Sequence, residues 1–579
     1  MDQNRTPIID ALRAYNERGI TSFDVPGHKR GLRCCDLQKL IGREAFLMDV
    51  NAPVGLDSFS KPHGVIKESL ELAADAYHAD HAFFIVNGSS GGVHIMIMTV
   101  CYDGDKILLP RNTHKSVTNA LILSGAVPVY IEPEINRRFG IASGVTLDTV
   151  RRAIEENPDA KVLFLVYPTY YGACTDIKSI IDYAHSKGVI VLVDQAHGAH
   201  FSFCSRLPKS AAELGADLVI TSTHKTGGSF TQSAMLLHNE GLVKYHSIKK
   251  RVIMFHTTSP SYLLMASLES SRKMLATEGE EIFTELAYEC RKAKRELAKI
   301  PGLVIQDPDI DETTGVRSMI YDPTKILINV TGLGLDGFDV YDIMSEKYGI
   351  QMELAEPMLV LAVVGIGDNA ETIGRLVDAF RDLSETYYGK YDPIAVPQDR
   401  ISVPPLVMSP RQAFYSDKKA ISFEDAIGEI AAEAVMIYPP GIPLCIPGER
   451  ITSETLAEIC YCKDNCSCMI KDSFEPDKIL VVVEEQNGNN GKNRKEKDRV
   501  GKSVHYEDVA MNIGNRSKGK SGRSGNRSGN RKSGGRSGSR NSGNKSGRSG
   551  NRNGKSNKNK KNRAGKIDQN RINRHGKNN

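Results

Sequence analysis

The chain has 579 residues, of which 40% are hydrophobic, enough to form the cores of two or more domains. It contains no apolar run of membrane-spanning length and no signal-peptide core after Met1, which excludes a membrane-spanning protein and predicts a cytoplasmic location. Eleven cysteines, scattered apart from one cluster, indicate reduced thiols. The net charge of +5 is unevenly distributed: residues 486–579 carry 27 Lys and Arg against 5 Asp and Glu, which leaves the preceding body acidic.

The amino-terminal part of the chain predicts a phosphate-binding turn. After helices over residues 7–18 and 65–78, the apolar run 82–86 predicts a buried strand and the stretch 93–100 predicts a helix. Between the last two stands the sequence Asn87-Gly88-Ser89-Ser90-Gly91-Gly92. A Gly/Ser turn before a helix start offers free N–H groups and hydroxyls to a phosphate, although an ordinary capped turn has the same composition.

Strands then alternate with helices. Strands are predicted at 106–109, 127–131 and 162–166, and helices at 147–156 and after Asp176. This alternation predicts an α/β fold with a mostly parallel sheet covered by helices on both faces.

His114 follows the strand predicted at 106–109. Ligands of such sheets collect at the carboxyl ends of the strands, and the flat ring of His114 could stack on a flat cofactor. A structural histidine is the alternative.

Two further buried strands, Val189 to Val193 and Leu218 to Ile220, both end in polar residues. These residues are Asp194 and His197 after the first strand, and Ser222, His224 and Lys225 after the second. Such a lysine can form an imine with pyridoxal phosphate, and a carboxylate facing the pyridine nitrogen keeps that nitrogen protonated, so that the ring accepts electrons from a carbanion. A surface lysine and a helix-capping aspartate are the alternative interpretation.

The second half of the chain predicts a smaller α/β domain, with strands at 326–330, 351–354 and 359–364 and a helix from about Phe338. The G-x-G-x-x-G match at residues 332–337 lacks a repeated βαβ context and does not predict a dinucleotide site. We expect four parts: a large domain with the amino-terminal segment (1–300), the small domain (301–395), a carboxyl-terminal domain (396–485) and a basic tail (486–579).

The last two parts carry fewer signals. Residues 460–468 contain four cysteines without the two-residue gap of zinc knuckles, so we expect free thiols on a loop and no metal site. The tail is rich in Gly, Asn, Ser, Lys and Arg and is predicted to be disordered. It could bind RNA or an acidic partner, or simply be a solvated tail that contacts the acidic body.

Six motifs stand out within residues 5–485. They are Phe23-Asp24-Val25-Pro26-Gly27-His28-Lys29, Val86-Asn87-Gly88-Ser89-Ser90-Gly91, Arg111-Asn112-Thr113-His114-Lys115-Ser116, Pro168-Thr169-Tyr170-Tyr171-Gly172, Asp194-Gln195-Ala196-His197-Gly198-Ala199-His200 and Ser222-Thr223-His224-Lys225. Together they resemble the pyridoxal-phosphate-dependent ornithine/lysine/arginine decarboxylases, whose large domain has the aspartate aminotransferase fold. Within that family the chain is most similar to the short bacterial biosynthetic arginine decarboxylases.

The resemblance implies decarboxylation of a basic amino acid, with arginine converted to agmatine in polyamine biosynthesis as the expected reaction, by a homodimer or larger homo-oligomer. Lysine or ornithine as substrate, or another reaction of the cofactor such as transamination, remain alternatives. By position, the resemblance assigns the imine to Lys225, the pyridine nitrogen to Asp194 and ring stacking to His114. The other implied contacts are Ser89, Ser90, Gly91, Ser222 and His224 at the phosphate, and His197 beside cofactor and substrate. Lys225 or a nearby histidine would protonate the substrate α carbon.

Overall fold

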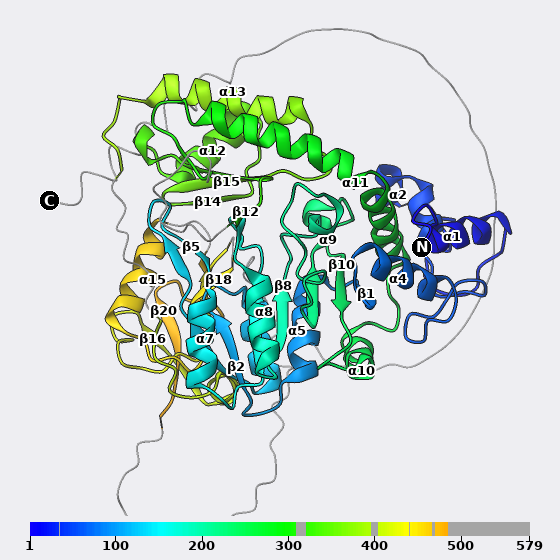
Figure 1. Cartoon of the computed structure of the whole chain (residues 1–579), viewed down its shortest axis with the longest axis horizontal. Helices are drawn as coiled ribbons and strands as arrows, with labels where there is room; N and C mark the ends of the chain where they lie inside the picture. Colours follow the sequence, from blue (N-terminus) through cyan, green and yellow to red (C-terminus); the bar gives the residue numbers. More distant parts are fainter. Residues whose placement is uncertain (34, 308–319, 395–402, 439–440, 466–468, 485–579) are drawn as a thin grey trace, which may run out of the picture. The chain divides into compact units, whose positions relative to one another are not determined.

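The computed structural model describes residues 1–33, 35–307, 320–394, 403–438, 441–465 and 469–484. They belong to one compact unit that spans Met1–Asn487 (Figure 1). The basic tail predicted over residues 486–579 lies outside the described residues. Among the described residues, no helix combines the length and the apolar character needed to cross a membrane.

At the centre of the unit is a seven-stranded sheet with the strand order β1-β10-β9-β8-β6-β2-β3. Its strands are β1 (His81–Ile85), β2 (Lys106–Pro110), β3 (Val127–Ile131), β6 (Val162–Val166), β8 (Ile190–Asp194), β9 (Leu218–Thr221) and β10 (Ala234–His238). Only β10 runs against its neighbours, β1 and β9, and the other pairs are parallel. The predicted mostly parallel sheet is confirmed.

Two hydrophobic cores cover the two faces of this sheet, because successive strand residues point to opposite faces. In β6, for example, Leu163 belongs to one core and Phe164 to the other. One core is completed by α5 (Gly88–Val100), α6 (Lys115–Ser124) and α10 (Tyr245–Phe255), and the other by α1 (Pro7–Glu17), α4 (Val65–Ala76), α7 (Leu147–Glu156), α8 (Ile177–Ser186) and α11 (Tyr262–Leu297). As predicted, Asp176 caps α8, since its carboxylate accepts the N–H of Ser179 at 3.3 Å.

A second sheet of four strands, in the order β11-β13-β15-β14, is antiparallel throughout. Its elements are β11 (Val304–Ile305), β13 (Lys325–Asn329), β14 (Leu354–Glu356) and β15 (Leu359–Val363), with helices α12 (Gly337–Tyr348) and α13 (Ala370–Tyr387). The carboxyl-terminal part contains α14 (Pro410–Tyr415), α15 (Ser453–Asn465), β16 (Lys418–Ser422), β17 (Val435–Ile437), β18 (Ile442–Cys445), β19 (Met469–Ile470) and β20 (Lys478–Val482). The short elements are α2 (Asp36–Ile41), α3 (Arg43–Met48), β4 (Glu134–Asn136), β5 (Ile141–Gly144), β7 (Ala173–Cys174), α9 (Thr223–Thr226) and β12 (Ile320–Tyr321). The domain boundaries predicted above stay a prediction.

Three local predictions are wrong. The helix expected over residues 93–100 begins at Gly88, because the Gly/Ser run, whose residues have low helix propensity, forms its first turn. The strand expected at 351–354 lies at Leu354–Glu356, where it pairs with β15. Cys460 and Cys462, expected on a loop, lie in α15, whereas the other two cysteines of that cluster lie outside the described residues.

Candidate active site

A cavity of about 330 Å³ lies at the carboxyl edge of the large sheet, within the range of about 300–1,000 Å³ usual for ligand sites. Eight of the predicted site residues line this cavity: Ser89, Ser90, His114, Asp194, His197, Ser222, His224 and Lys225. Gly91 is buried in α5 and is not part of the lining; a Cβ atom there would come within 2.5 Å of the Asn87 side chain. The structure therefore brings together every predicted site residue except Gly91.

Lys225 lies in the one-turn helix α9, directly after β9. Its Nζ is 2.7 Å from Nε2 of His197 and 5.7 Å from the centre of the Tyr170 ring. Burial lowers the pKa of Lys225, and the carboxylate of Asp194 opposes this shift. A lowered pKa increases the share of the neutral amine, which is the form that attacks an aldehyde.

Asp194 is the last residue of β8 and only 8% exposed. The N–H of Ala196 donates to its Oδ1 at 3.0 Å. Burial raises the pKa of Asp194, and the nearby Lys225 ammonium opposes the shift. Because an ionised carboxylate is costly to bury alone, this position favours a cationic partner such as a protonated ring nitrogen.

His114 caps α6, where its Nδ1 accepts the N–H of Ser116 at 3.2 Å. Burial, reinforced by the charge of Lys225, lowers the pKa of His114 to about 4. The imidazole is therefore neutral near pH 7. Gly441, from the carboxyl-terminal part, lies against this ring, since a Cβ atom there would be 3.2 Å from Cδ2 of His114. A flat, neutral ring fixed by these contacts suits stacking on a flat cofactor.

The first turn of α5 forms the part of the cavity that suits a phosphate. Ser222 donates its hydroxyl to Oγ of Ser89 at 2.7 Å. Gly88 adopts a left-handed φ of +78°, and its N–H donates to the carbonyl of Gln232 at 2.8 Å. The Gln232 amide in turn donates to the carbonyl of Val86 at 2.8 Å, which fixes the turn. Free N–H groups at the start of a helix, next to serine hydroxyls, fit the phosphate of pyridoxal phosphate.

The sequence analysis missed Lys325, whose side chain is buried and reaches this site from β13. Its Nζ lies 3.1 Å from Nδ1 of His197, so that His197 stands between two lysines. Burial lowers the pKa of Lys325 to about 8, and burial together with both lysines holds the pKa of His197 well below its usual range. A neutral imidazole has one N–H and one lone pair, so both contacts are hydrogen bonds only when one of the two amines is neutral. Lys325 is the first residue of an otherwise apolar strand, and no sequence motif around it indicates a role in the site.

Glu353, just before β14, was also missed. It lines the cavity with an exposed side chain, and the hydroxyl of Tyr170 donates to its Oε1 at 2.6 Å. The other unpredicted residues of the lining include Asn112, Ser116, Tyr171, Thr231, Gln232, Tyr438 and Ile442. Two of these, Tyr438 and Ile442, come from the carboxyl-terminal part. A buried ion pair of Arg111 and Glu449, 3.1 Å long, joins that part to the large sheet.

Comparison with known proteins gives a consistent result. Residues 6–372 match the family described as Orn/Lys/Arg decarboxylase, major domain, and residues 398–472 match the C-terminal domain of the same family. The arginine decarboxylase of Bacillus subtilis is 42% identical over 463 residues, which cover 79% of this chain and 94% of that protein. The arginine decarboxylase of Halalkalibacterium halodurans is 41% identical over 79% of this chain and 93% of that protein. The inducible lysine decarboxylase of Escherichia coli is 24% identical over 78% of this chain and 75% of that protein.

Solved structures support the fold. The lysine decarboxylase of Francisella novicida superposes with a TM-score of 0.72 over 83% of this chain and 81% of that one, at 20% identity. The constitutive lysine decarboxylase of E. coli gives a TM-score of 0.71 over 83% of this chain and 82% of that one, also at 20% identity.

Proposed function

Because this chain belongs to the Orn/Lys/Arg decarboxylase family and is a pyridoxal-phosphate-dependent amino-acid decarboxylase, we propose that its substrate is L-arginine, converted to agmatine and carbon dioxide in polyamine biosynthesis. The choice of arginine rests on the identity of 42% to a protein named arginine decarboxylase, against 24% to one named lysine decarboxylase. The observation that supports a basic substrate is the position of Glu353, whose carboxylate lines the same cavity as Lys225.

When bound, pyridoxal phosphate withdraws electrons from the substrate α carbon, which permits the loss of carbon dioxide. We assign Lys225 the covalent bond to the cofactor and Asp194 the proton on the ring nitrogen. His114 would stack on the ring and exclude water from one of its faces. His197, with Nε2 2.7 Å from Lys225, is placed to return a proton to the α carbon, either directly or through Lys225.

Glu353→Gln is expected to raise KM for arginine on the order of 10-fold while kcat changes less, because a neutral amide loses the charge-assisted hydrogen bond to the substrate guanidinium. The measurement is carbon dioxide release with arginine, lysine and ornithine offered separately. Glu346→Gln, an exposed change on α12, is the matched control. An unchanged KM would reject the role of Glu353, whereas preference for lysine or ornithine in the unaltered enzyme would reject the arginine assignment. A keto acid product would favour transamination.

Lys325→Met is expected to change how the rate depends on pH. Below its pKa of about 8, Lys325 is a cation that donates to Nδ1 of His197, which leaves the proton on Nε2, toward Lys225. Above that pH the neutral amine can also accept from Nδ1, so that the single proton of His197 is no longer confined to Nε2. We therefore expect kcat of the unaltered enzyme to fall as pH rises through about 8, and the variant to be about 10-fold slower without this step. Lys294→Met changes an equally buried lysine that does not line the cavity, so the fall of kcat near pH 8 should remain in this variant. If Lys325→Met also keeps it, Lys325 does not position the proton of His197.

Three further proposals concern assembly and surroundings. Homo-oligomer formation is supported by four large apolar side chains, of Phe23, Leu32, Leu40 and Val54, that are 70–94% exposed within one short stretch of the chain; sedimentation that gives a monomer would reject it. A cytoplasmic location is supported by five buried thiols that form no disulfide, those of Cys101, Cys174, Cys204, Cys290 and Cys445.

The proposal that residues 486–579 bind RNA rests on their charge alone. Equal RNA retention by a chain ending at residue 485 would reject it.

A further inference from the structure

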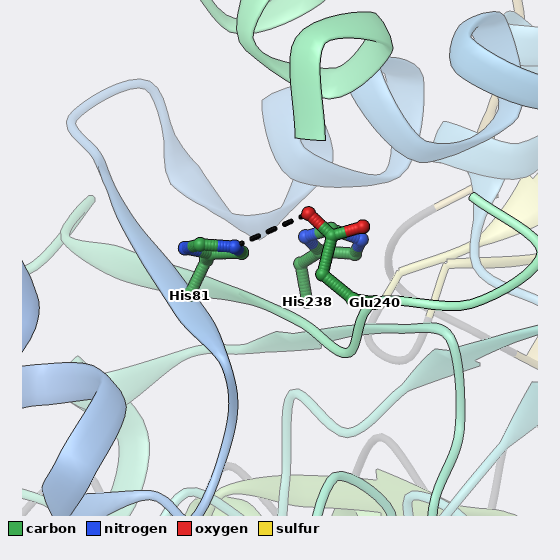
Figure 2. Close-up of side chains that lie close together, drawn as sticks. All are labelled: His81, His238 and Glu240. Atoms are coloured by element: carbon green, nitrogen blue, oxygen red, sulfur yellow. Dashed lines mark ion pairs between the residues drawn. The ribbon is translucent and has the colours of Figure 1, made fainter. Parts of the chain in front are cut away.

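Two histidines and a glutamate lie close together at the edge of the large sheet opposite to the cavity, and Figure 2 shows their side chains. His81 is the first residue of β1, and its cross-strand partner His238 is the last residue of β10. Glu240 follows two positions later. Nε2 of His81 lies 3.3 Å from Oε1 of Glu240, and one ligand atom from each of the three residues lies within 4.8 Å of the others.

The position separates this cluster from the decarboxylation chemistry. The residues of the cavity follow the carboxyl ends of the parallel strands, such as Asp194 at the end of β8, whereas His81 stands at the amino end of β1. A strand of five residues spans about 16 Å, so the cluster and the cavity lie at opposite ends of the strands.

His238 has the environment of a metal ligand. It is only 1% exposed, and its Nε2 lies 2.9 Å from the carbonyl oxygen of Val243. Since a carbonyl only accepts, Nε2 must carry the proton and Nδ1 the lone pair. This Nδ1 is buried and has no hydrogen-bond partner among the described residues. Histidine ligands of metals commonly donate their second N–H to a backbone carbonyl in this way.

We propose that His81, His238 and Glu240 bind a zinc ion at a site outside the decarboxylation centre. Two imidazoles and one carboxylate are an established zinc ligand set, and tetrahedral coordination places ligand atoms about 3.3 Å apart, as His81 and Glu240 already are. Magnesium and calcium prefer oxygen ligands alone. The other ligand atoms lie up to 4.8 Å apart, and the side chains that can move to close this distance are those of His81 and Glu240, which are 36% and 43% exposed, while His238 is buried.

The surroundings favour a cation and suggest what it does. The N–H of Glu240 donates to Oδ2 of Asp80 at 2.8 Å, which brings a second carboxylate to the cluster. Three protein ligands leave a fourth position for water. The ion would join the ends of β1 and β10, whose opposite ends carry Gly88 and Gln232 at the phosphate turn. It therefore stabilises this sheet edge without entering the reaction.

The test uses the full holoenzyme, free of any affinity tag. The protein is equilibrated with zinc chloride, desalted and analysed for zinc by mass spectrometry. His81→Ala and Glu240→Ala remove one ligand each, and both residues are partly exposed, so that folding is retained. His246→Ala, at an exposed histidine on α10, is the matched control. All eleven cysteines remain in every variant, so zinc held by thiols is the same in each.

We expect the unaltered enzyme and His246→Ala to hold one more zinc ion per chain than His81→Ala and Glu240→Ala. Added zinc should raise the midpoint of thermal unfolding of the first two proteins by several degrees more than that of the other two, while the rate of decarboxylation stays the same in all four. Equal zinc contents in all four proteins would overturn the proposal, as would a decarboxylation rate that depends on zinc in the unaltered enzyme.

Discussion

Replacing Lys225 by alanine is expected to lower carbon dioxide release from arginine on the order of 10⁴-fold or more. The reason is that Lys225 supplies the amine for the covalent bond to the cofactor, from a buried position where its pKa is lowered. The visible absorbance of the cofactor bound to a lysine should disappear with it. The measurement combines radiolabelled carbon dioxide release with the absorbance spectrum of the protein after addition of pyridoxal phosphate and desalting.

Lys244→Ala, which removes an exposed lysine next to α10, is the control and should leave both readings unchanged. The second buried amine, Lys325, lies on the other side of His197 and could bind some cofactor when Lys225 is gone. A variant with both Lys225→Ala and Lys325→Met separates that case. Normal turnover in the Lys225→Ala protein would reject the assignment of this lysine.

The second large effect is expected for Asp194→Ala, on the order of 10³-fold in kcat with weaker retention of the cofactor. Without the buried carboxylate, nothing at the end of β8 would hold a proton on the ring nitrogen, and the ring would accept electrons poorly. Asp194→Asn should behave almost as badly, because it keeps the size of the side chain and the contact to Ala196 but loses the charge. The measurement is kcat and the cofactor content after dialysis.

Asp182→Asn, an exposed change on α8, is the matched control for Asp194→Asn. If Asp194→Asn keeps near-normal turnover, the carboxylate serves packing and not the chemistry.

Most of the large sheet could be predicted because its strands are buried on both faces and therefore appear as short, unbroken apolar runs, such as Val189 to Val193. The residues directly after those runs, Asp194, Ser222 and Lys225, could be predicted to share a cavity because parallel strands end at one edge. The start of α5 could not be located, since Gly88 to Gly92 have no apolar periodicity and poor helix propensity.

The rest of the site depends on contacts between parts far apart in the chain. Lys325 reaches His197 from the second sheet, 128 positions away, and Glu353 and Tyr438 come from still later parts. The same holds for His81 and His238, which only the antiparallel pairing of β1 and β10 brings opposite each other. Local sequence patterns contain no information about which distant strand will be the neighbour.

The wall that Tyr438 and Ile442 contribute to the cavity has a consequence for how the enzyme is synthesised. A ribosome releases the large sheet with Lys225 and Asp194 long before residue 442 leaves the exit tunnel, and domains fold as they emerge. Until then, His114 lacks the contact with Gly441, and Arg111 lacks Glu449, its buried counter-charge. The nascent chain therefore carries an open, incomplete site from the release of Lys225 until Ile442 and Glu449 have emerged, and only then can the complete cavity form.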